Sequence, residues 1–393
     1  MSPWPSSAGA GGENLDLRAL LTYCQSTKEE MLRCLKAAVE IESPTNSKAG
    51  IDRLAESFAL EFRRRNGNVR VLGHPTAGSS VWAEFWGEKR GTKPLLLLGH
   101  LDTVWDVGTL KRMPFRLRRG RAYGPGIFDM KAGIVCGLWA VRALQACGIQ
   151  PASAVHMFLN SDEEAASVAF RKQLEAAALK ARAVLVLEPA AEGGALKTSR
   201  KGVGEFRITV QGRAAHAGIN PEAGVNAISE LARQLLRIEK FSRPRQGITL
   251  TAGVIEGGTR PNVVPERASA RIDVRISRLR DRELIERKLR GLNPVHPEAR
   301  LSIEGGINRP PMERRMAAGL FRRAKELARQ LGMDLQEASS GGGSDGNFTA
   351  ALGIPTLDGL GGVGDGAHAA HEHVVIRELP RRAALLAALL ANL

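Results

Sequence analysis

The sequence contains few cysteines and few tyrosines. Among its 393 residues there are four cysteines and two tyrosines. The cysteines show neither CxxC pairing nor the density of a disulfide framework, and none lies beside the histidine-rich segments. This argues against a disulfide-stabilised scaffold and against a cysteine-ligated metal site. We expect the thiols to be reduced packing residues of a cytoplasmic protein; they are Cys24, Cys34, Cys136 and Cys147.

Long hydrophobic runs are also absent. No stretch approaches the roughly 18 consecutive apolar residues that cross a bilayer, so no membrane association is expected. Residues 1–12 have neither the basic nor the apolar segment of a secretory leader, and we expect them to be disordered. A hydrophobic content of 43% with 25% charged residues is ordinary for a globular protein. The length predicts two domains.

Acidic residues are outnumbered by basic ones. There are 56 Lys and Arg against 41 Asp and Glu, and the formal net charge is +15. Such an excess can indicate a nucleic-acid-binding protein. However, only 5% of the residues are aromatic, and the densest basic run, residues 111–121, contains no recognisable binding module. Nucleic acid is therefore not an expected partner. We expect a solvated basic face that raises the local concentration of anionic small substrates.

Strand and helix signals alternate in the N-terminal half. Ser26 and Thr27, followed by Glu29 and Glu30, predict a helix N-cap with acids in the first turn. Further helices are expected at residues 51–65 and 132–146 and after Glu164, and strands at 69–72, 81–86, 95–98, 155–159 and 184–187. This order predicts an α/β fold with a mixed, mostly parallel sheet flanked by helices.

Between residues 201 and 310 the pattern changes. The segment reads strand, helix, strand, strand, helix, strand, which is the ferredoxin-like order. The strands are expected at 206–210, 248–255, 268–276 and 301–303, and the helices at 225–238 and 281–292. A helix over 312–331 then resumes the first pattern. We therefore expect a disordered segment at 1–12, a first domain made of 13–200 and 311–393, and an inserted domain at 201–310.

Polar side chains follow the apolar strand at residues 95–98. His100 and Asp102 are two residues apart, so they project to the same side of an extended chain. The spacing suits a metal ligand and its orienting carboxylate, because a metal-bound imidazole usually donates its other N–H to a carboxylate. A strand-end histidine with a capping aspartate is the alternative. Asp129 lies in a Gly-Pro-Gly turn before a helix, where a carboxylate can also serve only as an N-cap.

Further acids lie where buried strands end, at the edge where open α/β sheets bind ligands. Glu163 and Glu164 directly follow a strand and point in different directions, so one can ligate a metal while the other transfers a proton. Glu188 ends an apolar run and requires a positive partner. Three histidines fall within six residues, of which one or two can be ligands: His368, His371 and His373. Two histidines and three carboxylates suit a pair of zinc ions.

This set of motifs resembles the dizinc carboxypeptidase and aminoacylase family, which includes glutamate carboxypeptidase, succinyl-diaminopimelate desuccinylase, acetylornithine deacetylase and peptidase T. The five motifs occur in family order from about Thr27 onward, and the similarity is greatest to the glutamate carboxypeptidases. The resemblance implies two Zn²⁺ per chain, with Co²⁺ or Mn²⁺ as substitutes. One zinc would be held by His100 and Glu188, the other by Glu164 and His368, and Asp129 would bridge them.

The same resemblance implies roles for the neighbouring residues. Glu163 would act as general base and then as general acid, and Asp102 would orient His100. A cis peptide bond would follow Asp129, as it often does in family members.

The choice among the three histidines also rests on the resemblance. His368 is preferred to His371 because Glu372 and Val374 then fall four and six residues later, as they do in the family.

The insert resembles the family's lid and dimerisation domain. His216 would stabilise the oxyanion in the partner subunit's site, so that activity depends on a homodimer and on lid closure. Asn262 and Arg275 match positions that bind the substrate's terminal carboxylate, which suits the guanidinium fork. Gly343 lies in a glycine-rich turn that opens a helix and offers backbone N–H groups. Lys197 falls one residue from the position that grips an acidic side chain.

These roles predict zinc-dependent hydrolysis of an amide bond, releasing a C-terminal glutamate or similar amino acid from an N-acyl or peptidyl conjugate. The expected substrates are small N-acyl amino acids, folate-like conjugates or dipeptides. An N-acyl amino acid deacylase of the acetylornithine deacetylase or desuccinylase type is the alternative. A more remote one is a non-catalytic protein that binds anionic ligands or nucleic acid on the same fold, favoured only by the net charge. No cysteine occupies the position of the cysteine ligand in auxin-conjugate aminoacylases.

Overall fold

The computed structural model describes residues 16–86 and 91–393, so the disorder expected for residues 1–12 lies outside the described residues. The chain forms two compact units. The first comprises Met1–Ser199, Arg314–Ser340 and Ser344–Leu393, and the second comprises Arg200–Glu313 with Gly341–Gly343. The sequence pattern predicts limits for the insert at 201 and 310, and it does not predict that Gly341–Gly343 group with it.

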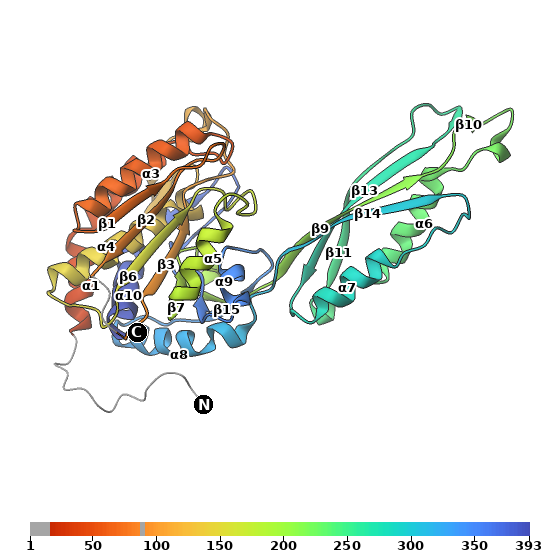
Figure 1. Cartoon of the computed structure of the whole chain (residues 1–393). Coiled ribbons are helices and arrows are strands. Elements are labelled where there is room, and N and C mark those ends of the chain that lie inside the picture. Colours follow the sequence, from red (N-terminus) through yellow and green to blue (C-terminus); the bar gives the residue numbers. More distant parts are fainter. Residues whose placement is uncertain (1–15, 87–90) are drawn as a thin grey trace. The chain divides into compact units, whose positions relative to one another are not determined.

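A six-stranded sheet organises the first unit (Figure 1). Its strands lie in the order β1 (Asn68–Leu72), β2 (Ser80–Phe85), β6 (Val155–Asn160), β3 (Leu95–His100), β7 (Ala183–Val186) and β16 (Thr356–Leu357). The β6–β3, β3–β7 and β7–β16 pairs are parallel, whereas β1–β2 and β2–β6 are antiparallel. The predicted α/β class with a mostly parallel sheet is confirmed. The strands β6, β3 and β7 are buried along their whole length.

Helices pack on both faces of this sheet, which explains the uniformly apolar central strands. One face, with Leu98 and Phe158, packs against α5 (Arg171–Lys180) and α9 (Gly346–Ala351). On the opposite face α4 (Ala132–Ala146) comes so close that a Cβ on Gly137 would lie 3.1 Å from Met157 Cε. The unit also contains α1 (Leu17–Ser26), α2 (Lys28–Val39), α3 (Lys48–Arg63), α8 (Arg314–Gln330) and α10 (Glu378–Asn392). In the described part of the chain, no helix combines the length and the apolar character needed to span a bilayer.

The start of α2 is correctly predicted, but its capping is not. The helix begins at Lys28, directly after Thr27, yet the Thr27 hydroxyl does not bond to the first turn. It donates instead to the carbonyl of Tyr23 in the preceding helix at 2.9 Å and accepts from Trp139 Nε1 at 3.0 Å. A tertiary contact with α4 therefore replaces the expected local cap.

Short strands that the sequence pattern does not predict complete this unit. The strands β4 (Arg116–Arg118), β5 (Arg121–Tyr123), β18 (His373–Val375) and β17 (Gly364–Asp365) form an antiparallel sheet, and β8 (Leu196–Arg200) pairs with β15 (Glu337–Ser340). The β5–β18 pairing brings the basic run beside the histidine-rich segment. Single helical turns lie at Thr109–Lys111 in this unit and at Pro221–Ala223 and Pro244–Gln246 in the second. The turns at Ile127–Lys131 and Glu192–Gly194 include residues with non-helical backbone angles.

The second unit has the predicted ferredoxin-like order (Figure 1). Along the chain its elements are β9 (Gly202–Gln211), α6 (Ala227–Glu239), β11 (Thr249–Gly257), β13 (Arg267–Ile276), α7 (Asp281–Arg290) and β14 (Arg300–Arg309). The four strands form an antiparallel sheet in the order β11-β13-β9-β14, and both helices cover one face of it. The strands β10 (Ala215–His216) and β12 (Val263–Val264) form a separate ladder.

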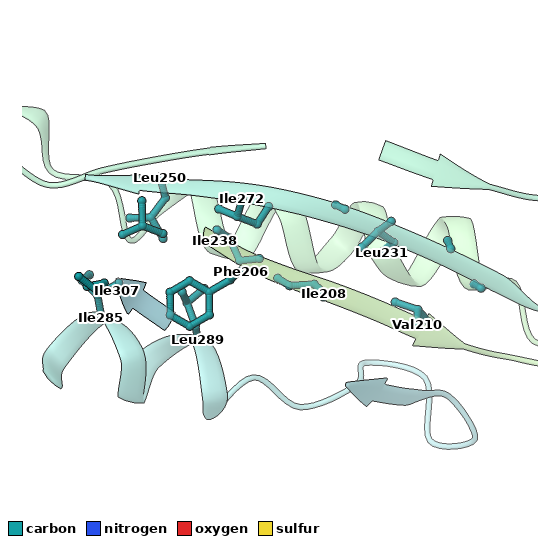
Figure 2. Packing of buried hydrophobic residues seen from close by; sticks show 14 of the residues in the cluster. Phe206, Ile208, Val210, Leu231, Ile238, Leu250, Ile272, Ile285, Leu289 and Ile307 are labelled. Atoms are coloured by element: carbon teal, nitrogen blue, oxygen red, sulfur yellow. The ribbon is translucent and has the colours of Figure 1, made fainter. Parts of the chain in front are cut away.

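The core of the second unit follows from alternation along β9. Phe206, Ile208 and Val210 are buried, whereas Glu205 and Arg207 on either side of Phe206 are exposed. Figure 2 shows the three apolar side chains in one cluster with residues of β13, α6 and α7. Period-two alternation gives a strand one apolar face, and the two helices bury that face.

Candidate metal centre

His100 ends β3 in the middle of the first unit's sheet. Its side chain is 2% exposed, and its Nδ1 lies 3.0 Å from the backbone oxygen of Asp102 and 3.4 Å from Asp102 Oδ1. These contacts fix the ring, so that Nε2 faces two other carboxylates. It lies 3.2 Å from Asp129 Oδ1 and 3.5 Å from Glu188 Oε1. The strand end thus presents one imidazole nitrogen to a group of acids.

Asp129 lies between two imidazoles. While its Oδ1 faces His100, its Oδ2 lies 3.5 Å from Nε2 of His368. The peptide bond between Asp129 and Met130 is cis, as the family resemblance implied. A carboxylate whose two oxygens face two different histidines has the geometry of a ligand shared by two cations.

Glu163 and Glu164 lie in the loop that follows β6. Their backbone N–H groups each donate to Asp102, to Oδ1 and Oδ2 respectively, at 3.1 Å. Glu164 Oε1 lies 3.2 Å from His368 Nε2. Ligand atoms lie within 4.8 Å of one another in two groups, one with His100, Glu163 and Glu188 and one with His100, Asp129 and Glu164. Asp102, which is fully buried, therefore positions both glutamates as well as the histidine.

The helix expected after Glu164 is present, but a loop separates it from the two glutamates. Ala166 and Ser167 have φ angles of 72° and 57°, in the left-handed region that non-glycine residues rarely adopt. The helix α5 therefore begins only at Arg171. The loop keeps Glu163 and Glu164 outside regular structure, at the edge of the sheet.

Of the three clustered histidines, His368 alone contacts these carboxylates within the described residues. The side chain of His371 is 66% exposed, and its Nε2 lies 4.0 Å from Asp365 Oδ2. His373 is buried on β18, where its ring lies 5.2 Å from that of Tyr123. This geometry supports the choice of His368 as the ligand.

The charges of the centre favour a cation. Hydrogen bonds that the protonated His368 donates to Asp129 and Glu164 raise its pKa to about 10. Burial opposes protonation of His100, but its neighbouring carboxylates raise its pKa well above the usual value. Burial also raises the pKa of Glu164. The raised pKa values of the two histidines reflect a high density of negative charge, and imidazole nitrogens with carboxylate oxygens form a donor set that suits zinc. The residues present therefore fit a metal centre.

Glu372 has a positioning role that sequence reasoning missed. Its fully buried carboxylate accepts hydrogen bonds from Trp105 Nε1 at 2.7 Å and from the backbone N–H groups of Gly126, Phe128 and Asp129 at 2.9, 2.9 and 3.1 Å. In the sequence it served only to select His368 by its spacing. The structure shows that it holds the turn that carries Asp129.

Two of the remaining predicted residues are neighbours in the second unit. His216 on β10 pairs with Val263 on β12, and the N–H of Ala217 donates to the carbonyl oxygen of Asn262 at 3.0 Å. The His216 ring is exposed, and its Nδ1 accepts from the N–H of Gly218 at 3.1 Å. His216 and Asn262 are thus brought together by one short ladder.

Arg275 and Gly343 also belong to the second unit, and Lys197 belongs to the first. The Arg275 guanidinium forms a bidentate ion pair with Asp273, with Nε–Oδ1 and Nη2–Oδ2 distances of 2.9 Å. The carbonyl oxygen of Gly343 accepts from Arg200 Nη1 at 3.2 Å. Lys197 lies on β8, and its backbone N–H donates to the backbone carbonyl oxygen of Asp358 at 2.9 Å. Arg275 is therefore engaged by Asp273 of its own strand, which is the salt bridge that an arginine on a strand usually forms.

Comparison with known proteins identifies the family. The sequence model of peptidase family M20/M25/M40 matches residues 96–392. The chain belongs to this family. Carboxypeptidase G2 of Pseudomonas sp. (strain RS-16) is 30% identical to the M20 chain over 374 residues, covering 92% of this chain and 89% of the relative. Succinyl-diaminopimelate desuccinylase of Dechloromonas aromatica (strain RCB) is 26% identical over 400 residues, covering 96% of this chain and 98% of the relative.

Solved structures show the same fold. Aminopeptidase PepT from Bacillus cereus ATCC 10987 matches with a TM-score of 0.77 at 21% identity, covering 93% of this chain and 98% of that chain. The M20 family metallo-carboxypeptidase Sso-CP2 from Sulfolobus solfataricus matches with a TM-score of 0.72 at 18% identity, covering 92% of this chain and 99% of that chain. The predicted family and the predicted enzymatic character are confirmed: the chain is a hydrolase of the M20 metallopeptidase type.

Proposed function

We propose that the M20 enzyme binds two zinc ions at this centre. The observation that carries the proposal is the position of Asp129, whose two carboxylate oxygens each face a different imidazole. His100 and Glu188 would hold one ion, Glu164 and His368 would hold the other, and Asp129 would bridge them. Co²⁺ or Mn²⁺ can substitute in such a ligand set. Two bound ions would polarise the amide carbonyl and lower the pKa of the attacking water.

In this proposal Glu163 moves the proton. Its carboxylate lies within 4.8 Å of ligand atoms of His100 and Glu188, so it can take a proton from the water that attacks the carbonyl. The same carboxyl group then gives the proton to the departing amine. Asp102 holds Glu163 through the backbone hydrogen bond at 3.1 Å and fixes the His100 ring.

The proposed reaction releases a C-terminal glutamate or a similar amino acid from an N-acyl or peptidyl conjugate, such as a folate-like molecule or a dipeptide. The similarity to carboxypeptidase G2 supports this choice. Asn262 and Arg275 would bind the terminal carboxylate, for which Arg275 would exchange its present partner Asp273. His216 would stabilise the oxyanion. A backbone N–H at Gly343 would assist carboxylate binding, and Lys197 would bind an acidic side chain.

A homodimer through the second unit forms part of the proposal. β11 is at an edge of the sheet, and Val254 and Ile255 on it are 44% and 60% exposed. On α6, Ile228 and Leu236 are 42% and 63% exposed. A Cβ on Gly257 of β11 would lie 3.0 Å from Ile228, so the two sets adjoin. An exposed edge strand with apolar neighbours favours pairing with a second copy.

We also propose a cytoplasmic location. All four cysteines are free thiols, and burial raises the pKa values of Cys24, Cys34 and Cys136 to about 12, so that these thiols stay protonated and unreactive.

An N-acyl amino acid deacylase is the second candidate. The 26% identity to a succinyl-diaminopimelate desuccinylase over 96% of the chain favours it. The two candidates use the same metal centre and differ in the group that the substrate presents to the second unit.

A hydrolysis assay with matched substrates tests the proposal. The zinc-loaded enzyme is given N-benzoyl-glutamate, N-benzoyl-glutamine and N-succinyl-diaminopimelate, and the released amine is measured. We expect kcat/KM for the glutamate conjugate to exceed that for the glutamine conjugate by about tenfold or more, because an unpaired charged group in the pocket is costly. A chelator should abolish the activity and zinc should restore it. A preference for the succinyl substrate would favour the deacylase, and no hydrolysis of any amide would refute both.

A further inference from the structure

The hairpin formed by β4 and β5 carries an unusual concentration of arginine. In its register Arg116 pairs with Tyr123, and Arg118 pairs with Arg121. Paired residues of neighbouring strands project to the same face of a sheet, so these side chains share one face. A recess of about 350 Å³ is lined there by Arg118, Arg119, Arg121 and Tyr123. We call Arg116, Arg118, Arg119 and Arg121 the arginine face.

This hairpin departs from the rules that stabilise hairpins. Like charges directly opposite each other destabilise a strand pair, yet Arg118 faces Arg121. The turn residues Arg119 and Gly120 have φ angles of 48° and 73°, and the first such position favours asparagine or glycine over arginine. Within residues 16–86 and 91–393, no acid forms an ion pair with any of the four arginines. The opposed arginines, the left-handed Arg119 and the lack of neutralising acids among the described residues all disfavour the stability of this hairpin. Residues that disfavour stability tend to gather at functional sites, so we interpret the hairpin as a binding site.

The arginine face adjoins the metal centre through its strands. β5 pairs with β18, and Tyr123 lies opposite His373. Along the chain Tyr123 precedes Asp129 by six residues, and His373 follows His368 by five. An extended chain covers at most about 3.6 Å per residue, so the recess lies within roughly 20 Å of the metal-centre loops. The recess and the metal-centre loops therefore lie in neighbouring parts of the first unit.

The chemistry of the recess favours carboxylates over nucleic-acid bases. Each guanidinium offers a planar fork of donors that matches an oxyanion. Binding of single-stranded nucleic acid would require aromatic rings on which bases stack. Tyr123 is the recess's one aromatic residue, and its ring already contacts the Arg116 guanidinium at 5.1 Å and the His373 ring at 5.2 Å. The recess therefore lacks a free ring for a base.

We propose that the arginine face binds an acidic peptide segment through two or more carboxylates. This binding site is distinct from the residues assigned to metal, proton transfer and terminal carboxylate, and it goes beyond the proposed function. It assigns a use to part of the net charge of +15 that the metal centre does not explain.

Fluorescence anisotropy of the full-length, zinc-loaded protein tests the proposal. The probe is a fluorescein-labelled hexaglutamate with an amidated C-terminus, which has no terminal carboxylate for carboxypeptidase action. The variant Arg118→Gln/Arg121→Gln removes two charges from the arginine face. The control Arg33→Gln/Arg53→Gln removes two charges from exposed positions of α2 and α3. We expect Kd to rise about tenfold in the first variant and less than about twofold in the control.

Salt and probe chemistry provide the remaining comparisons. Binding should weaken as salt rises from about 50 to 150 mM, because exposed charges are screened. A hexaglutamine probe should not bind. Equal loss of affinity in both double variants, or equal binding of hexaglutamine, would overturn the proposal. A single-stranded oligothymidylate of equal charge that binds more tightly, with the same dependence on Arg118 and Arg121, would also overturn it in favour of nucleic acid.

Discussion

Glu163 and Glu164 are adjacent, yet the proposal gives them separate tasks. Glu164 Oε1 lies 3.2 Å from His368, whereas Glu163 is grouped with His100 and Glu188. We expect Glu163→Gln to lower kcat by about 10²–10⁴, because the amide cannot accept the proton. Two zinc ions should remain bound, as measured by metal analysis of the dialysed protein. Glu164→Gln is the matched control and should lower the zinc content. Loss of zinc from Glu163→Gln would show that Glu163 is a ligand.

Replacement of Asp129 tests whether this residue bridges two metal ions. A single carboxylate between two imidazoles can offset the charge of two cations only about 3.5 Å apart. The variant Asp129→Ala should therefore hold fewer than two zinc ions per chain at saturating zinc and should lose activity. The exposed Asp106, replaced in the same way, is the control and should change neither measurement. Two tightly held ions in Asp129→Ala would place the bridge elsewhere.

At the scale of elements, one buried carboxylate accepts hydrogen bonds from both ends of the loop that carries Glu163 and Glu164. Asp345, before α9, accepts a hydrogen bond from Asn160 Nδ2 at 2.7 Å and another from the Ser167 hydroxyl. Asn160 ends β6 and Ser167 lies beyond the two glutamates, so Asp345 holds both ends of the loop. We infer that it is a positioning residue for the proton-transfer group.

Replacing Asp345 by alanine should have two effects. Asn160 Nδ2 and the Ser167 hydroxyl would each lose a buried acceptor, which should destabilise the fold by about 1–3 kcal/mol, measured by thermal unfolding. Release of the loop should also lower kcat more than it raises KM, and Asp345→Asn, which keeps one acceptor oxygen, should restore part of kcat. If Asp345→Ala loses stability but keeps kcat and zinc affinity, the network is structural only.

The accuracy of the sequence-based prediction also depends on the element. The predicted limits of α4 match the observed ones to the residue, and those of β6 match to within one residue. A long apolar run or a helical period can be recognised from neighbouring residues alone. The hairpin of β4 and β5 is missed because strands of three residues contain no period. The acids at strand ends were recognisable from type and position. Glu372 was not, because its partner Asp129 is 243 residues away and only the fold brings them together.

At the scale of the whole molecule, the proposal requires residues from both units. The proposed ligands and Glu163 belong to the first unit, whereas His216, Asn262 and Arg275 belong to the second. In a symmetric dimer each chain can supply the second unit's residues to its partner. Activity would then depend on assembly, and dilution below the dimer dissociation constant should lower it.

Mixing two inactive variants tests this arrangement. If His216 acts at the partner subunit's centre, exchange between His216→Ala and Glu163→Gln chains creates mixed dimers in which one site combines an intact Glu163 with an intact His216. Equimolar mixing yields mixed dimers as half of the population, so about a quarter of the wild-type activity should return. Mixing Glu163→Gln with Glu164→Gln is the control: each site takes both glutamates from one chain, so no activity should return. Mass spectrometry of the intact dimers shows whether the chains exchange. If they do and the mixture of His216→Ala with Glu163→Gln stays inactive, His216 acts in its own chain or outside catalysis.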